Sequence, residues 1–176
     1  MKYRDCFLIL LLALSLAAQA EDAKDLFAAA MMGKLERTEA LLAQGIDVNG
    51  KTASGRTALM AASFNGNVKI VKALLAYGAD VSIADNLGTT ALMDAAVFGD
   101  EEIVNSLIAA GADVNAVDKQ NATVMARAKK IGHEKVIKIL EKAGATDEKK
   151  EEEQTPIEDA KAAPKDGAGA KPAEKK

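Results

Sequence analysis

Apolar residues recur at helical spacing through the middle of the chain, and this pattern repeats every 33 residues. One face of a helix is marked by Ile70, Val71, Leu74 and Leu75. The same spacing returns at Ile103, Val104, Leu107 and Ile108, 33 positions further on. Two series of glycines keep the same step: Gly33, Gly66, Gly99 and Gly132, and Gly45, Gly78, Gly111 and Gly144. Four copies without an insertion predict a repeat protein.

Each copy is predicted to form two short helices and a loop. In the second copy, we expect the first helix from about Thr57 to Asn65, ending at Gly66. Asn67 then stands where it can cap the second helix. That helix ends at Gly78, because a left-handed backbone suits a residue without a Cβ atom.

A helix pair of this size cannot bury its apolar face alone, so neighbouring pairs must stack into an all-α solenoid. The last copy carries Glu141 where the inner copies have Leu75 and Ile108, as a terminal helix facing water requires. We therefore predict a solenoid domain over residues 21–145, with copies at about 22–51, 52–84, 85–117 and 118–145.

The first twenty residues follow a different pattern. Two basic residues precede an apolar run from Cys6 to Leu14, and small residues around Ala20 are followed by acidic Glu21. This order predicts a secretory signal peptide over residues 1–20. The alternative, an uncleaved membrane anchor, is less favoured because spanning a bilayer takes about 20 apolar residues. The mature chain has no Cys, which excludes structural disulfides, thiol catalysis and Cys metal sites.

The repeated motifs resemble the ankyrin repeat over residues 22–145. They include the 33-residue step, the T-x-L-x-x-A core and the Gly-Ala-Asp-Val-Asn closure. The family's T-P-L-H appears as Thr57-Ala58-Leu59-Met60, Thr90-Ala91-Leu92-Met93 and Thr123-Val124-Met125-Ala126. The helix-starting Pro is therefore missing, as is the His that usually bonds to the Thr. The resemblance implies β-turn fingers and a concave groove that binds another protein.

Together with the signal peptide, the repeats resemble those of small periplasmic ankyrin proteins of Gram-negative bacteria. Some of those proteins accompany periplasmic catalases. The resemblance thus implies a periplasmic or secreted location.

Composition and charge narrow the function. The net charge of -3 argues against a nucleic-acid partner, since such proteins normally carry a basic surplus. Residues 146–176 are rich in Glu, Lys, Ala and Pro, and they offer little apolar surface to offset the entropy of ordering. We predict that this charged tail is disordered. The alternative is that it serves as a cell-wall or interaction tether.

Candidate catalytic and metal-binding residues are few. The single His, His133, follows a mid-repeat Gly and is interpreted as a polar start to a helix. Asp94 and Arg127 lie at the same position of successive copies, and we expect an inter-repeat ion pair rather than a catalytic acid and a clamp. No set of Ser, His and Asp and no phosphate-binding loop is found. We therefore expect no enzymatic activity, no cofactor and no bound metal.

A row of large side chains at the end of each copy's first helix is more informative. In the family this position lines the concave groove beside the turn tips. The predicted partner-binding residues are Met31, Met32, Phe64, Val97, Phe98 and Ile131 on the helices, and Arg56, Leu87 and Lys119 on the turns. The alternative is that Phe64 and Phe98 pack on each other as extra core.

These observations predict a monomeric, non-catalytic protein that binds another protein in the periplasm or outside the cell. An exported enzyme such as a catalase is the partner that the resemblance suggests. The alternative function is a structural or envelope-tethering protein that uses its charged tail.

Overall fold

The described part of the chain, residues 21–147 of a computed structural model, is a stack of four helix pairs. A helical segment at residues 21–31 pairs with α2 (Leu35–Ala43). The following pairs are α3 (Ala58–Phe64) with α4 (Val68–Ala76), α5 (Ala91–Phe98) with α6 (Glu101–Ala109), and α7 (Val124–Ile131) with α8 (Glu134–Lys142). Within these residues there is no β-strand. The predicted all-α repeat solenoid is confirmed.

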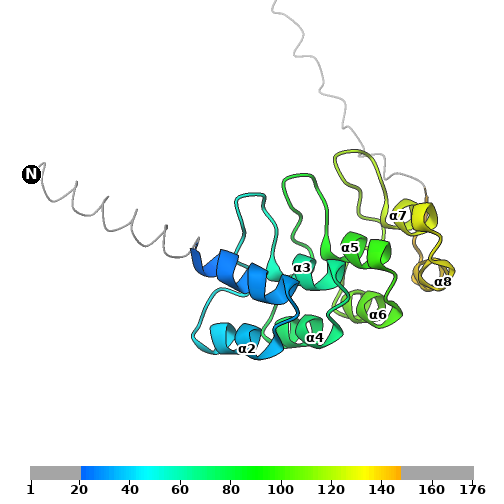
Figure 1. Cartoon of the computed structure of the whole chain (residues 1–176). Coiled ribbons are helices and arrows are strands. Elements are labelled where there is room, and N and C mark those ends of the chain that lie inside the picture. Colours follow the sequence, from blue (N-terminus) through cyan, green and yellow to red (C-terminus); the bar gives the residue numbers. More distant parts are fainter. Residues whose placement is uncertain (1–20, 148–176) are drawn as a thin grey trace, which may run out of the picture.

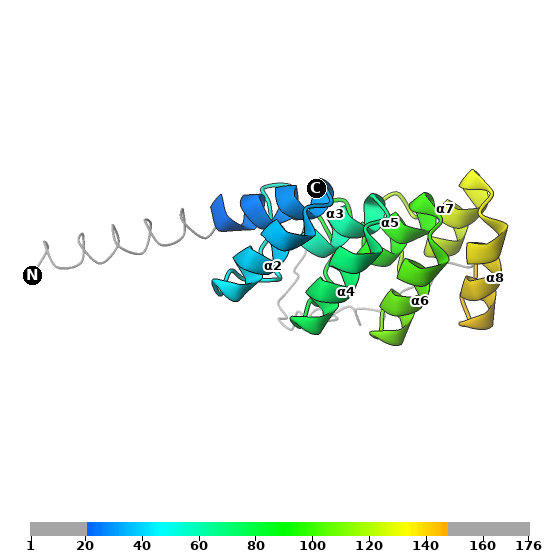
Figure 2. The same ribbon diagram turned by 60° about the horizontal axis from the view of Figure 1, so that its bottom comes forward.

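The helices form two rows, with the loops projecting beyond the first row. Figure 1 shows α3, α5 and α7 in one row beneath the projecting loops, and the second helix of each pair in another row. Figure 2 shows α2, α4, α6 and α8 side by side. Along the stack α3 packs on α5 and α5 on α7, while α4 packs on α6 and α6 on α8. Each pair is thus covered by its neighbours, as the repeat pattern required.

The core is built from small and aliphatic side chains that the pattern had placed there. Leu74 and Leu107, at matching positions of α4 and α6, are fully buried. In the first row Leu59 and Leu92 are buried together with the alanines around them. Because alanines occupy so much of this row, the helices can approach closely and still exclude water.

The first-row helices keep their threonine caps although the helix-starting Pro is absent. The hydroxyl oxygens of Thr57, Thr90 and Thr123 each accept a hydrogen bond from the amide three residues later. A capping hydroxyl of this kind contributes about 1 kcal/mol. In the second row Asp100 caps α6 by accepting from the amide of Ile103 at 2.9 Å.

The predicted cap at Asn67 is wrong. Asn67 does precede α4, but its side-chain amide donates to the carbonyl of Ala30 in the preceding repeat, at 2.8 Å. His133, at the same position of the last repeat, likewise hydrogen-bonds the carbonyl of Val97 at 2.9 Å. These side chains connect neighbouring repeats, because the end of the preceding first-row helix lies within their reach.

The end of the solenoid includes two residues that we assigned to the tail. The amide of Thr146 donates to Oδ1 of Asn115 at 2.8 Å, and Asp147 pairs with Lys129 of α7. The predicted signal peptide and residues 148–176 of the predicted tail lie outside the described residues. Between residues 21 and 147 no helix is long and apolar enough to cross a membrane.

Candidate protein-binding surface

Large apolar side chains stand exposed at the end of the first helix in all four repeats. Phe64, Phe98 and Ile131 are the last residues of α3, α5 and α7, and Met31 ends the helical segment 21–31. We call these four residues, together with Met32, the apolar row. The exposed fractions are 46% for Met31, 65% for Met32, 49% for Phe64, 46% for Phe98 and 52% for Ile131.

The row is exposed because each first-row helix leaves the core in its last turn. All residues of α3 before Phe64 are buried, and so are the first six residues of α5. Val97, which we also predicted to bind a partner, is half-buried, and its carbonyl bonds to His133. The five residues of the apolar row, in contrast, present about half or more of their surface to solvent.

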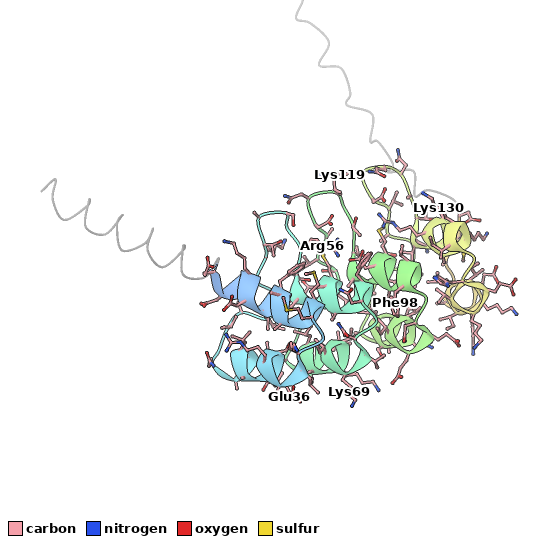
Figure 3. All side chains as sticks on the ribbon, viewed as in Figure 1. Glu36, Arg56, Lys69, Phe98, Lys119 and Lys130 are labelled. Atoms are coloured by element: carbon pink, nitrogen blue, oxygen red, sulfur yellow. The ribbon has the colours of Figure 1, made fainter. Side chains whose placement is uncertain are left out.

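Phe98 also packs against the preceding repeat. A Cβ atom built on Gly66 would lie only 2.0 Å from Cε1 of Phe98, so the aromatic ring rests on the backbone at this glycine. Gly66 has φ +68, a conformation that L side chains rarely adopt. The contact fixes the ring while about half of Phe98 stays exposed, and Figure 3 shows Phe98 at the end of α5.

The loops that project beside the first row are connected at their tips. The amide of Asn86 donates to the carbonyl of Ser54 at 3.0 Å. The amide of Lys119 donates to the carbonyl of Leu87 at 2.9 Å. The second and third of these loops are narrow, since isolated bridges pair Ala84 with Thr90 and Val117 with Thr123. These loops are the predicted β-turn fingers, and they hold exposed Leu87 and Lys119 in fixed positions.

Arg56 differs from the other predicted contact residues because its side chain turns towards the protein. Its guanidinium lies 2.5 Å from Oδ2 of Asp94 on α5 and 3.6 Å from Oδ2 of Asp85 on the next finger. Asp94 is almost fully buried. The structure therefore gives Arg56 the internal role of joining a finger to the helix of the following repeat.

The ion pair that we expected between Asp94 and Arg127 is replaced by two separate pairs. Asp94 pairs with Arg56, while Nη2 of Arg127 lies 2.6 Å from Oδ2 of Asp118 and donates to the hydroxyl of Thr89 at 3.3 Å. Both partnerships join a finger to a helix that follows it. We call Arg56, Asp85, Asp94, Thr89, Asp118 and Arg127 the charged network.

Burial and charge act in opposite directions on the two central carboxyl groups of the charged network. Burial raises the pKa of Asp94 to about 6, even though Arg56 and Arg127 both favour the charged form. For Asp118 burial also acts to raise the pKa, but hydrogen bonds from the Ala122 amide and from Arg127 outweigh it, so the pKa is lowered. Asp94 is thus the carboxyl that titrates nearest to neutral pH among those with a resolved shift.

The charged network was missed from the sequence, although a signal for it exists. Arg56 and Asp94 are 38 residues apart, and so are Thr89 and Arg127. The common spacing is one repeat plus five residues. A search for complementary residues at that spacing would have found both contacts.

No metal site is found in the part of the chain that the structure describes. Between residues 21 and 147 no group of three or more His, Cys, Asp or Glu side chains is placed to hold a metal ion.

Comparison with known proteins assigns the chain to a family. A family model described as ankyrin repeats in three copies matches residues 26–118 and, in a second match, residues 92–163. No curated protein matches the chain. Ankyrin repeats are protein–protein interaction modules, and the family is typically non-catalytic. Since the matches cover well over half of its length, the chain belongs to the ankyrin-repeat family.

Proposed function

We propose that this protein is exported and binds another protein through the apolar row and the neighbouring finger residues Leu87 and Lys119. The observation that carries the proposal is the exposure of large apolar side chains at the end of the first helix in four successive repeats. Single exposed apolar residues are common, but a contiguous exposed set marks an interaction surface. Methionines at one end add a flexible, polarisable contact area.

The scaffold supports this proposal because the surface is already ordered. Finger tips are joined by backbone hydrogen bonds, and the charged network ties the fingers to the helices. Phe98 is held by its contact with Gly66. A preformed surface loses little conformational freedom on binding, so more of the contact energy appears as affinity.

The proposed location and partner class rest on the first twenty residues and on the resemblance to exported ankyrin proteins. A partner must then be another exported protein, and an exported enzyme such as a catalase is the first candidate. Mass spectrometry of the protein from its native host should find Glu21 as the mature N-terminus. Recovery of a chain that still begins at Met1 would contradict export with cleavage.

Replacement of Phe98 tests the binding surface. Because an apolar anchor at the centre of an interface commonly contributes about 2 kcal/mol or more, Phe98→Ser should weaken capture of a partner at least about tenfold. Capture from a periplasmic extract identifies the partner, and its affinity is then measured by titration with both chains.

The matched control is Lys69→Glu on α4, away from the apolar row (Figure 3). Lys69 is preferable to Lys72, because Lys72 pairs with Glu102 of the next repeat. The control should bind as the parent chain does. A folded Phe98→Ser chain with undiminished affinity would show that the apolar row is not the binding surface.

A further inference from the structure

The fourth repeat gives the binding surface a basic end. Lys130 occupies the position that holds Met31, Phe64 and Val97 in the earlier repeats. Lys130 is exposed at the end of α7, and Lys119 is exposed on the finger that precedes this helix (Figure 3). Within residues 21–147 neither lysine is part of an ion pair, so both charges are available to a ligand.

The chain leaves the solenoid beside this basic end. Oδ2 of Asp147, the last described residue, lies 2.5 Å from Nζ of Lys129, which directly precedes Lys130. The amide of Thr146, one residue earlier, is held by Asn115. The segment that follows therefore starts next to the lysines of the fourth repeat.

The following sequence has the chemistry that these lysines would bind. Residues 151–159 contain five carboxylates, one isoleucine and no basic residue. Residues 160–176, in contrast, carry five lysines against two acidic residues. Glu151 is four residues from Asp147 and can reach about 14 Å from it, and Ile157 can reach about 35 Å.

We propose that the acidic segment, residues 151–159, binds to Lys119 and Lys130 and so covers the fourth-repeat end of the protein's own binding surface. Ile157 is the isoleucine of the acidic segment, and exposed Ile131 is the member of the apolar row in this repeat. The acidic segment acts as a built-in competitor, which a partner must displace from this end of the surface.

Because the acidic segment is covalently attached to the solenoid, even a weak contact with the two lysines is enough to cover this end of the surface. Exposed ion pairs contribute little individually, but a short flexible linker gives an effective concentration on the order of millimolar. A contact with a dissociation constant of about 1 mM is then formed about half of the time. Because the charges lie at the surface, salt should disrupt it: the screening length falls to about 3 Å at 1 M.

A spin label tests the contact without any partner. The chain from residue 21 to 176 has no Cys, so Gln154→Cys gives one attachment site in the middle of the acidic segment. At low salt the label should broaden the amide signals of Lys119, Lys130 and Ile131 in a nuclear magnetic resonance spectrum. The signals of Lys34 and Asn67, in the first two repeats, should stay sharp and serve as the internal reference.

Two matched variants of the labelled chain separate a charge contact from simple proximity. Replacing both lysines, Lys119→Glu with Lys130→Glu, should reduce the broadening at Ile131 at least about threefold, as should 1 M salt. Neutralising the segment, by changing Glu151, Glu152 and Glu153 to Gln, should have the same effect and leaves the solenoid untouched.

The proposal is overturned if the broadening at Ile131 is absent at low salt. It is equally overturned if the broadening persists in both variants and at 1 M salt. Since no partner takes part, a failure of partner capture would count against the proposed function alone.

Discussion

Replacement of Asp94 by Asn should change how the stability of the protein depends on pH. Asp94 is buried between Arg56 and the rest of the charged network, and its pKa is about 6 against an ordinary value of 3.8. A proton therefore binds more tightly to this carboxyl in the folded chain than in the unfolded chain. Protonation of Asp94 therefore favours the folded state. The contribution of this carboxyl to the free energy of unfolding is present at low pH and is lost as the pH rises through about 6.

The magnitude follows from the two pKa values. A difference of one in pKa corresponds to about 1.4 kcal/mol, so a rise from 3.8 to about 6 corresponds to about 3 kcal/mol. Relative to the Asp94→Asn chain, the parent should lose most of this, about 2 kcal/mol of free energy of unfolding, between pH 4 and pH 7, because an unfolded Asp is already more than half ionised at pH 4. The other carboxyl groups titrate in both chains and largely cancel in the difference.

Denaturant titrations of both chains at several pH values between 4 and 7.5 measure this difference. Asp118→Asn is the matched control, because the pKa of Asp118 is lowered and its contribution should have the opposite sign. The reasoning is refuted if the free energies of unfolding of the parent and the Asp94→Asn chain differ by the same amount, within about 0.5 kcal/mol, at every pH. It is also refuted if the difference grows in favour of the parent towards neutral pH.

Two further substitutions test the packing of the repeats. Leu107→Ala should lower the free energy of unfolding by about 2–5 kcal/mol in a denaturant titration, because Leu107 is fully buried, and a loss below about 0.5 kcal/mol would contradict its place in the core. Gly66→Ala should lower the melting temperature more than Gly78→Ala, since both glycines have positive φ but only the Cβ at Gly66 would meet another residue, the ring of Phe98. Equal losses for the two glycine variants would show that the ring is not held at Gly66.

The helices and their limits could be predicted from the sequence because they depend on local features that recur. Gly66 and Gly99 have the positive φ that the pattern required, and Asn121, with φ 62, adopts the turn in place of a glycine. The burial of Leu74 and Leu107 follows from helical spacing, which needs no knowledge of the neighbouring repeat.

Polar partners could not be predicted in the same way, because they depend on how one repeat is offset from the next. We assumed that Asp94 would pair with the residue at its own position one repeat later. The structure instead places it against a finger residue 38 positions earlier. Asn67 was misplaced for a similar reason: the carbonyl of Ala30 competes with the first turn of its own helix for the side chain.

The candidate binding surface combines features that could be predicted from the sequence with features that could not. The exposure of Phe64 and Phe98 follows from their position at the end of a buried helix. The contact between Phe98 and Gly66, and the inward turn of Arg56, follow from the stacking distance and could not be read from either repeat alone.

The 38-residue pairing also constrains how this gene can change length. Because each repeat contacts only its neighbours, loss of one 33-residue unit leaves the fold possible. Here, removal of the third repeat, residues 85–117, would bring Arg127 to the position that Asp94 holds opposite Arg56. Two guanidinium groups would then share the single carboxylate of Asp118 in a buried place, at a cost in stability. The repeats of this protein are therefore similar in sequence but not interchangeable in order.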